Sequence, residues 1–222
     1  TPNRAGEFAG RILYVNHSDK IKASLITIFA SMSQLVITIS VGSVCLLFYL
    51  QKIISSSFVF YPLCSLVILL AAGLVFLFIY FPFLAERFSS LAVFRKFTNY
   101  ISVFKLNRPR VLIAVLCLSL LRYIVFVHQY YFLLRIFFPE TPYLISLQMI
   151  SIIYLVLSVI PTFAISEISV RSSVALYYLG AIISNPVAIA LASLSIWLIN
   201  IVIPSLTGSI LFLTLKLENG KD

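Results

Sequence analysis

The chain has 222 residues, of which 61% are hydrophobic and only 10% are charged, and its mean hydropathy is +1.09. A water-soluble domain of this length exposes far more charge, so the composition excludes that class of protein. The net charge of +9 does not indicate nucleic-acid binding, because six of the sixteen basic residues lie together in residues 87–110, between two apolar runs. Backbone groups in lipid must be bonded internally, so the chain is predicted to be an all-α, polytopic membrane protein.

The first half of the chain is predicted to contain one polar segment and two spans. Residues 1–17 are too polar for a lipid-facing span, although Thr1 can cap a helix and Pro2 suits its first turn. Residues 18–22 are interpreted as a charged loop. The apolar runs at residues 23–50 and 58–84 are each long enough to cross a hydrocarbon core of about 30 Å.

A basic segment, residues 85–110, separates the two halves. Its large apolar residues recur at steps of three and four, and Arg or Lys residues punctuate them. This pattern is typical of an amphipathic helix that lies on the membrane surface and contacts anionic lipid. The concentration of positive charge predicts that this segment is cytoplasmic.

The second half begins with a span at residues 111–134 and a loop at 137–142. Residues 143–160 are apolar but short for a spanning helix, and Pro161 follows at once. We therefore expect two half-length helices that meet near Pro161, followed by a final span at residues 186–215.

Two unusual segments form an internal repeat. Pro2, Glu7 and Arg11 match Pro161, Glu167 and Arg171 at offsets of 159 or 160, and ASMSQLVIT (30–38) is similar to ASLSIWLIN (192–200). The sequence thus predicts one transmembrane domain over residues 1–222, with repeat one at 1–84 and repeat two at 111–222. A span and a half-length helix precede the second motif, and the repeat predicts equivalent elements before the first motif, where the sequence starts at Thr1. We therefore expect about 60–100 N-terminal residues of the natural protein to be missing.

The charge distribution predicts how the two repeats are oriented. If residues 85–110 are cytoplasmic, residues 18–22 are cytoplasmic too and 137–142 are external. A re-entrant hairpin over residues 143–183 then places the C-terminus, with Lys216 and Lys221, in the cytoplasm. The result is an inverted repeat with two re-entrant, broken-helix segments, a plan whose site lies near the midplane. A single crossing by 143–183 is the alternative, and it puts the basic tail outside.

Ionisable residues inside the membrane are the candidate site, because each costs at least about 2.5–3.5 kcal/mol to insert. Glu7 and Glu167 each stand four residues before an arginine, on the same helix face, and are assigned ion pairing or ion coupling. A neutralising ion pair is the simpler interpretation of these residues. Arginine forks also match phosphate oxygens, which makes four arginines candidate ligands for a lipid phosphate: Arg4, Arg11, Arg122 and Arg171.

Three further positions are ambiguous. Arg122 lies midway along its span, either paired with a carboxylate such as Glu167 or lining a cavity. His128 and Gln129 are either interfacial groups or the polar lining of that cavity. No catalytic motif or metal-ligand spacing is present, so we expect neither an enzyme, a cofactor nor a metal site.

Three stretches resemble a known family: TPNRAGEFAGR (1–11), LLRYIVFVHQYY (120–131) and IPTFAISEISVR (160–171). They are similar to the lysylphosphatidylglycerol synthase transmembrane region, also called flippase-like membrane proteins. The second motif departs from the family pattern because it has Ala164 and Ile165 in place of glycines. The resemblance implies a bacterial-type protein of the cytoplasmic (inner) membrane that moves or binds lipids. The chain ends soon after its last span, so the aminoacyl transferase activity of the best-known relatives is not expected.

These observations favour a translocase for a membrane lipid, either an anionic phospholipid or a lipid-linked glycan. One alternative is a membrane scaffold or regulator that docks an envelope-synthesis enzyme through residues 85–110. Another is an ion-coupled carrier of small solutes that uses Glu7 and Glu167. A second copy of the chain and an envelope enzyme both remain open as partners.

Overall fold

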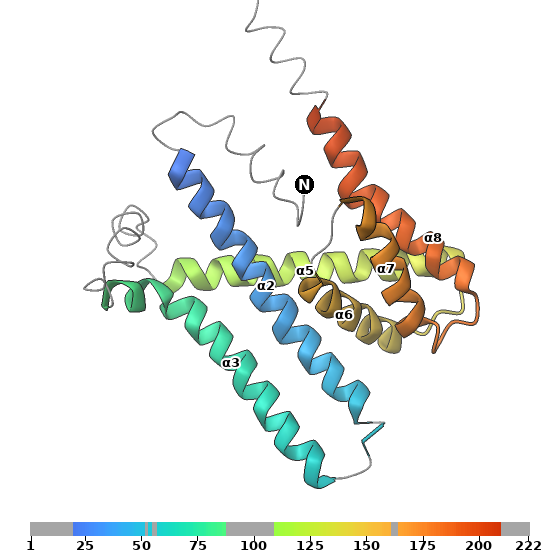
Figure 1. The fold of residues 1–222 in the computed structure, drawn as a ribbon, viewed down its shortest axis with the longest axis horizontal. Helices are drawn as coiled ribbons and strands as arrows, with labels where there is room; N and C mark the ends of the chain where they lie inside the picture. The colour runs from blue at the N-terminus through green and yellow to red at the C-terminus, as the bar shows by residue number, and fades with distance from the viewer. Residues whose placement is uncertain (1–19, 52, 55–56, 88–108, 161–163, 210–222) are drawn as a thin grey trace, which may run out of the picture.

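The computed structural model describes residues 20–51, 53–54, 57–87, 109–160 and 164–209, and every regular element in these ranges is a helix (Figure 1). This confirms the predicted all-α class. The helices are α2 (Lys20–Leu50), α3 (Ser57–Arg87), α5 (Pro109–Phe137), α6 (Tyr143–Val159), α7 (Ala164–Leu179) and α8 (Pro186–Trp197), and α8 runs directly into the π-helical turn η2 (Leu198–Val202).

Within the described residues, four segments are long and apolar enough to cross a membrane: Ile26–Leu50, Phe60–Phe81, Arg110–Phe137 and Pro186–Ser209. They coincide with the four predicted spans, so the prediction of an integral membrane protein is confirmed at this level. One boundary was wrong. Helix α2 already begins at Lys20, inside the segment interpreted as a charged loop, because a helix end can carry lysines into the interfacial region.

Helix α5 is the centre of the arrangement. It contacts α2, α3, α6 and α8, and it crosses the long helices obliquely (Figure 1). In the same view α2 and α3 run side by side in opposite directions, and α8 runs opposite to α2. The residues of α5 that face its neighbours are buried, with Tyr130 and Leu134 fully enclosed.

Helix α6 is short and packs in the interior of the bundle. Its 17 residues correspond to about 25 Å of helix, less than the hydrocarbon thickness. Helices α2, α5 and α7 surround it, and Ile150, Ile152 and Ile153 have no exposed surface. The approach of α2 is close at Gly42, where an added Cβ would lie 2.6 Å from the Cβ of Leu155.

Helices α6 and α7 form a hairpin. The connection from α5 to α6 and the connection from α7 to α8 lie at the same end of the molecule, at the right of Figure 1. Pro161 falls between the two helices and lies outside the described residues. Two half-length helices that meet at this point were predicted, and the structure has them at Tyr143–Val159 and Ala164–Leu179.

The local sequence explains where the last helices end and begin. Helix α7 ends at Leu179, and the amide of Gly180 still donates to the carbonyl of Leu176 at 3.0 Å. Asn185 then caps α8, because its side-chain oxygen accepts from the amides of Val187 and Ala188, both at 3.1 Å. Pro186 occupies the first turn of α8, where its missing N–H costs no intrahelical hydrogen bond.

Candidate functional site

A buried ion pair is the most unusual feature of the apolar core. Nη2 of Arg171 donates to Oε1 of Glu167 at 2.8 Å, one turn apart on α7. Each residue is only 8% exposed. The spacing predicted that both side chains share one helix face, and their contact agrees with that prediction. A single buried charge would be costly in hydrocarbon, so the pair lets α7 sit in the membrane with no net charge at this point.

The pair does not use all the hydrogen-bonding capacity of the arginine. The Nε–H of Arg171 is buried and makes no hydrogen bond in the described part of the chain. A guanidinium has five N–H donors and no acceptor, so an oxygen-rich anion is the natural partner for the donor that remains. The site can therefore neutralise a carboxylate and still present a donor to a second acceptor.

A pair of buried hydroxyls lies on the helices next to α7. The oxygens of Tyr130 on α5 and Ser193 on α8 are 2.5 Å apart, and both residues are fully buried. Because the Ser193 hydroxyl donates to the carbonyl of Ile189, Tyr130 is the donor to Ser193. The charge of Arg171 is within electrostatic range of Tyr130. Polar groups from α5, α7 and α8 thus gather in one region of an otherwise apolar bundle.

A second buried hydroxyl pair joins α2 to α5. The oxygens of Ser33 and Ser119 are 2.7 Å apart, and Ser33 is fully buried. The repeat aligns Ser33 with Ser195 and Ser31 with Ser193, so the two buried serines do not occupy equivalent positions. Each serine anchors its helix to a hydroxyl on α5.

Arg122 does not pair with Glu167, the carboxylate that was considered as its partner. It is exposed on α5, and its guanidinium lies 5.1 Å from the ring centroid of Phe126. A cation over an aromatic ring is stabilised without a carboxylate. Glu167 pairs with Arg171 instead, because the helical turn between them fixes that contact locally. Arg122 is therefore not part of the buried charge pair.

His128 and Gln129 are next to each other on α5 but bind different neighbours. Nδ1 of His128 is 2.8 Å from the carbonyl of Ile124, and its Nε2 is 2.9 Å from the hydroxyl of Tyr143 on α6. The side-chain oxygen of Gln129 accepts from Asn200 at 3.2 Å. Both residues also line an open groove along α5, which agrees with their interpretation as polar lining but places them at the surface of the bundle.

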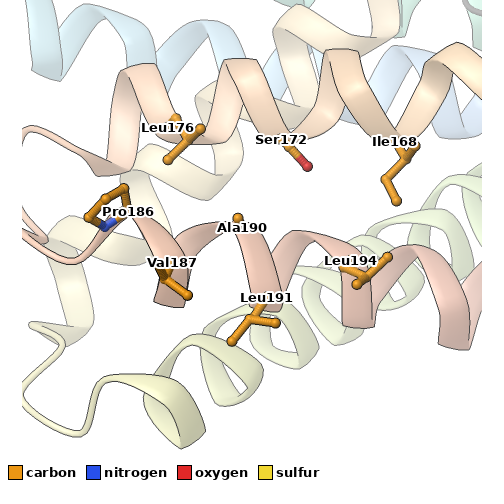
Figure 2. A pocket seen from close by; sticks show the side chains of 8 residues that line it. All are labelled: Ile168, Ser172, Leu176, Pro186, Val187, Ala190, Leu191 and Leu194. Atoms are coloured by element: carbon orange, nitrogen blue, oxygen red, sulfur yellow. The ribbon is translucent and has the colours of Figure 1, made fainter.

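Figure 2 shows another groove, between α7 and α8, with a volume of about 500 Å³. The lining side chains of the two helices face one another, and the hydroxyl of Ser172 is the one polar side-chain group among them. Ile168 and Ser172 directly follow Glu167 and Arg171 in the sequence, so the groove runs beside the charge pair. Its lining consists of Ile168, Ser172, Leu176, Pro186, Val187, Ala190, Leu191 and Leu194.

Sequence reasoning missed the two hydroxyl pairs. Serines and tyrosines are common in apolar helices, so neither Tyr130 nor Ser193 stood out. No spacing in the sequence marks these residues, because each hydroxyl has its partner on another helix. The π-helical turn η2 contains Asn200.

Several predicted features lie outside the described residues. These are the first motif with Arg4, Glu7 and Arg11, most of the basic segment 85–110, and the C-terminal tail. Among the described residues, no group of three or more His, Cys, Asp or Glu side chains could hold a metal ion.

Comparison with known proteins gives no relative. No family model matches the chain, and no curated protein and no solved structure is similar to it.

Proposed function

We propose that this protein is a flippase-like translocase of the cytoplasmic membrane that moves a lipid bearing a phosphate, either an anionic phospholipid or a lipid-linked glycan. One observation carries the proposal: a guanidinium buried in an apolar bundle, neutralised by Glu167, with its Nε–H left without a partner. A purely neutralising pair has no need of this extra donor. A phosphate oxygen matches it in charge and geometry.

The position of the pair supports this role. Helix α7 has 16 residues, or about 24 Å, and begins at Ala164. Because α6 and α7 enter and leave at the same end of the molecule, a re-entrant hairpin explains their arrangement. Glu167 and Arg171 lie in the first two turns of α7, so they are well below the surface from which the hairpin enters. The proposed phosphate site is then near the midplane.

The relation between α2 and α8 supports an inverted repeat, a plan common among transporters. The two helices run in opposite directions in Figure 1. Opposite directions are expected of corresponding helices in two related halves with opposite topology. The lysylphosphatidylglycerol synthase transmembrane region is the family to which we would assign such a chain.

Transport is tested by reconstituting the protein in liposomes with fluorescent lipids and measuring how much lipid becomes accessible from outside. The informative variant replaces both partners, as Glu167→Met with Arg171→Met. Removing both partners together avoids leaving the Arg171 guanidinium without its carboxylate, so this variant disturbs the fold less than either single change. A charge-assisted hydrogen bond contributes about 1.5–3 kcal/mol, so loss of the phosphate ligand slows transport at least about tenfold.

The control is Arg135→Ala, because Arg135 is an exposed arginine in the last turn of α5, away from the pair. It should transport like the unaltered protein. Two results contradict the proposal: lipid movement no faster than in empty liposomes for anionic phospholipids and a lipid-linked glycan alike, or full activity in the double methionine variant. The second result would show that the pair only neutralises itself.

The carrier alternative is favoured by one observation, the burial of the Glu167 carboxylate. If this group carries a proton or ion, Glu167→Gln abolishes transport and removes its dependence on a pH gradient. If it only balances Arg171, the same variant keeps transport that is insensitive to the gradient.

A further inference from the structure

The groove along α5 combines an apolar surface with polar side chains, unlike the groove between α7 and α8. It has a volume of about 570 Å³, within the range of small-molecule sites of roughly 300–1,000 Å³. One wall is the face of α5 from Ile124 to Ile136, which is about 18 Å long at 1.5 Å per residue. Ile199 of η2 contributes the other wall. The exposed apolar side chains along it include Val125, Phe132 and Ile136.

Hydrogen bonds to neighbouring groups determine which atoms of His128 and Gln129 donate and which accept. Because the carbonyl of Ile124 can only accept, Nδ1 of His128 carries its proton, and Nε2 accepts from Tyr143. Both ring nitrogens are therefore occupied. The oxygen of Gln129 is occupied by Asn200 at 3.2 Å. The bond to Asn200 is the one side-chain hydrogen bond of Gln129 within the described residues, and it uses the oxygen, so the two N–H donors of Nε2 are the open polar groups of the groove.

An open N–H donor on an apolar helix face requires an acceptor, because the hydrocarbon offers none and an unsatisfied donor is costly there. The acceptors that adjoin hydrocarbon chains in a membrane are the ester carbonyls of glycerolipids. Gln129 is eight residues from the end of α5, about 12 Å along the axis.

We infer that this groove, here called the α5 groove, is a binding site for an ester-linked glycerolipid, with an acyl chain along Val125, Phe132 and Ile136 and an ester carbonyl accepting from Nε2 of Gln129. Asn200 is a positioning residue, because its hydrogen bond fixes which way the Gln129 amide faces. The π-helical turn supports this contact, since it brings Asn200 to α5 while Ile199 closes the groove. The site depends on α5 lying in the membrane and not on any transport of the lipid.

The test compares two phospholipids with the same headgroup and chain length, one linked through esters and one through ethers. Only the diester has the carbonyl. Lipid that stays bound to the purified protein is measured by native mass spectrometry, with both lipids in competition. The unaltered protein should prefer the diester by about three- to tenfold, the effect expected of one hydrogen bond. Gln129→Leu should abolish that preference and keep the binding of both lipids, because leucine preserves the apolar wall.

Other variants separate this site from its alternatives. Ile199→Trp fills the groove and should lower the binding of both lipids, whereas Arg135→Ala should change neither. The double methionine variant of Glu167 and Arg171 should keep the diester preference, so failure of the proposed transport does not imply failure here. A lipid with a photoreactive chain should label the peptide that contains Phe132. The inference is overturned if the unaltered protein binds both lipids equally, if Gln129→Leu keeps the preference, or if the label falls elsewhere.

Discussion

Helices α3 and α7 show two opposite ways for a helix to sit in this molecule. Helix α3 has 31 residues, packs only along α2 and α5 among the described elements, and exposes large side chains such as Phe58, Leu69 and Phe76. Helix α7 has 16 residues and buries an ion pair against α6 and α8. The longer and more apolar helix therefore leaves most of its large side chains exposed, whereas the short helix buries the face that carries its ion pair.

This difference follows from the solvent. In lipid an apolar surface gains little by packing on another apolar surface, so α3 can remain exposed without cost. A charge pair gains much by being enclosed, because lipid offers it no other partner. Polar residues, more than hydrophobicity, thus decide which helices of a membrane protein become central.

The largest loss of stability is expected when the buried ion pair on α7 is broken. Glu167→Ala removes the carboxylate that pairs with Arg171 and leaves a buried guanidinium without compensation, so the free energy of unfolding should fall by about 3–5 kcal/mol. Unfolding in mixed micelles with increasing SDS measures this. The matched control is Glu140→Ala, an exposed carboxylate in the loop before α6, which should change stability by less than about 0.5 kcal/mol. Equal effects of the two variants would mean that the pair on α7 contributes nothing to stability.

Features that depend on a single helix, in α3 and α7 alike, could be predicted from the sequence. The four long spans were predictable because length and hydropathy together leave no other fold for such runs. The contact between Glu167 and Arg171 was predictable because a spacing of four fixes it within one helix. Pro161 indicated the break between the two short helices, because proline removes a helical hydrogen bond.

Contacts between different helices were not predictable in this way. The bonds of Ser33 to Ser119 and of Gln129 to Asn200 depend on how α5 crosses α2 and α8, and no local pattern encodes a crossing angle. Arg122 is the clearest case. Its depth in the span suggested a carboxylate partner, but the exposed face of α5 leaves it over the ring of Phe126.

Two glycines allow a close contact between helices to be compared with an exposed helix surface. Gly42 lies where α2 meets α6, and an added Cβ would be 2.6 Å from the Cβ of Leu155, whereas Gly73 on α3 has no atom within 4 Å of that position. Gly42→Ala should therefore destabilise by about 1–3 kcal/mol, because the helices must move apart. Gly73→Ala should stabilise by about 0.5–1 kcal/mol through helix propensity alone. The SDS unfolding midpoints of the two variants should shift in opposite directions, and a shift of the same sign would show that α2 and α6 are not closely packed at Gly42.

The smallest expected effect concerns the two hydroxyl pairs on α5. A double-mutant cycle of Tyr130→Phe and Ser193→Ala should give a coupling free energy of about 0.6 kcal/mol, and at most about 1.7, as hydrogen bonds between membrane helices do. The exposed Tyr177→Phe should show no coupling to Ser193→Ala.

A second cycle, of Ser33→Ala and Ser119→Ala, should give a smaller coupling free energy than the first. Tyr130 must donate to Ser193, whereas the protons of Ser33 and Ser119 can exchange roles. Ser33 can also donate to the carbonyl of Ala30 at 2.8 Å, so it loses less when Ser119 is removed than Tyr130 loses with Ser193. A coupling free energy on α2 equal to or larger than that on α8 would show that the alternative acceptor at Ala30 does not compensate for the lost contact.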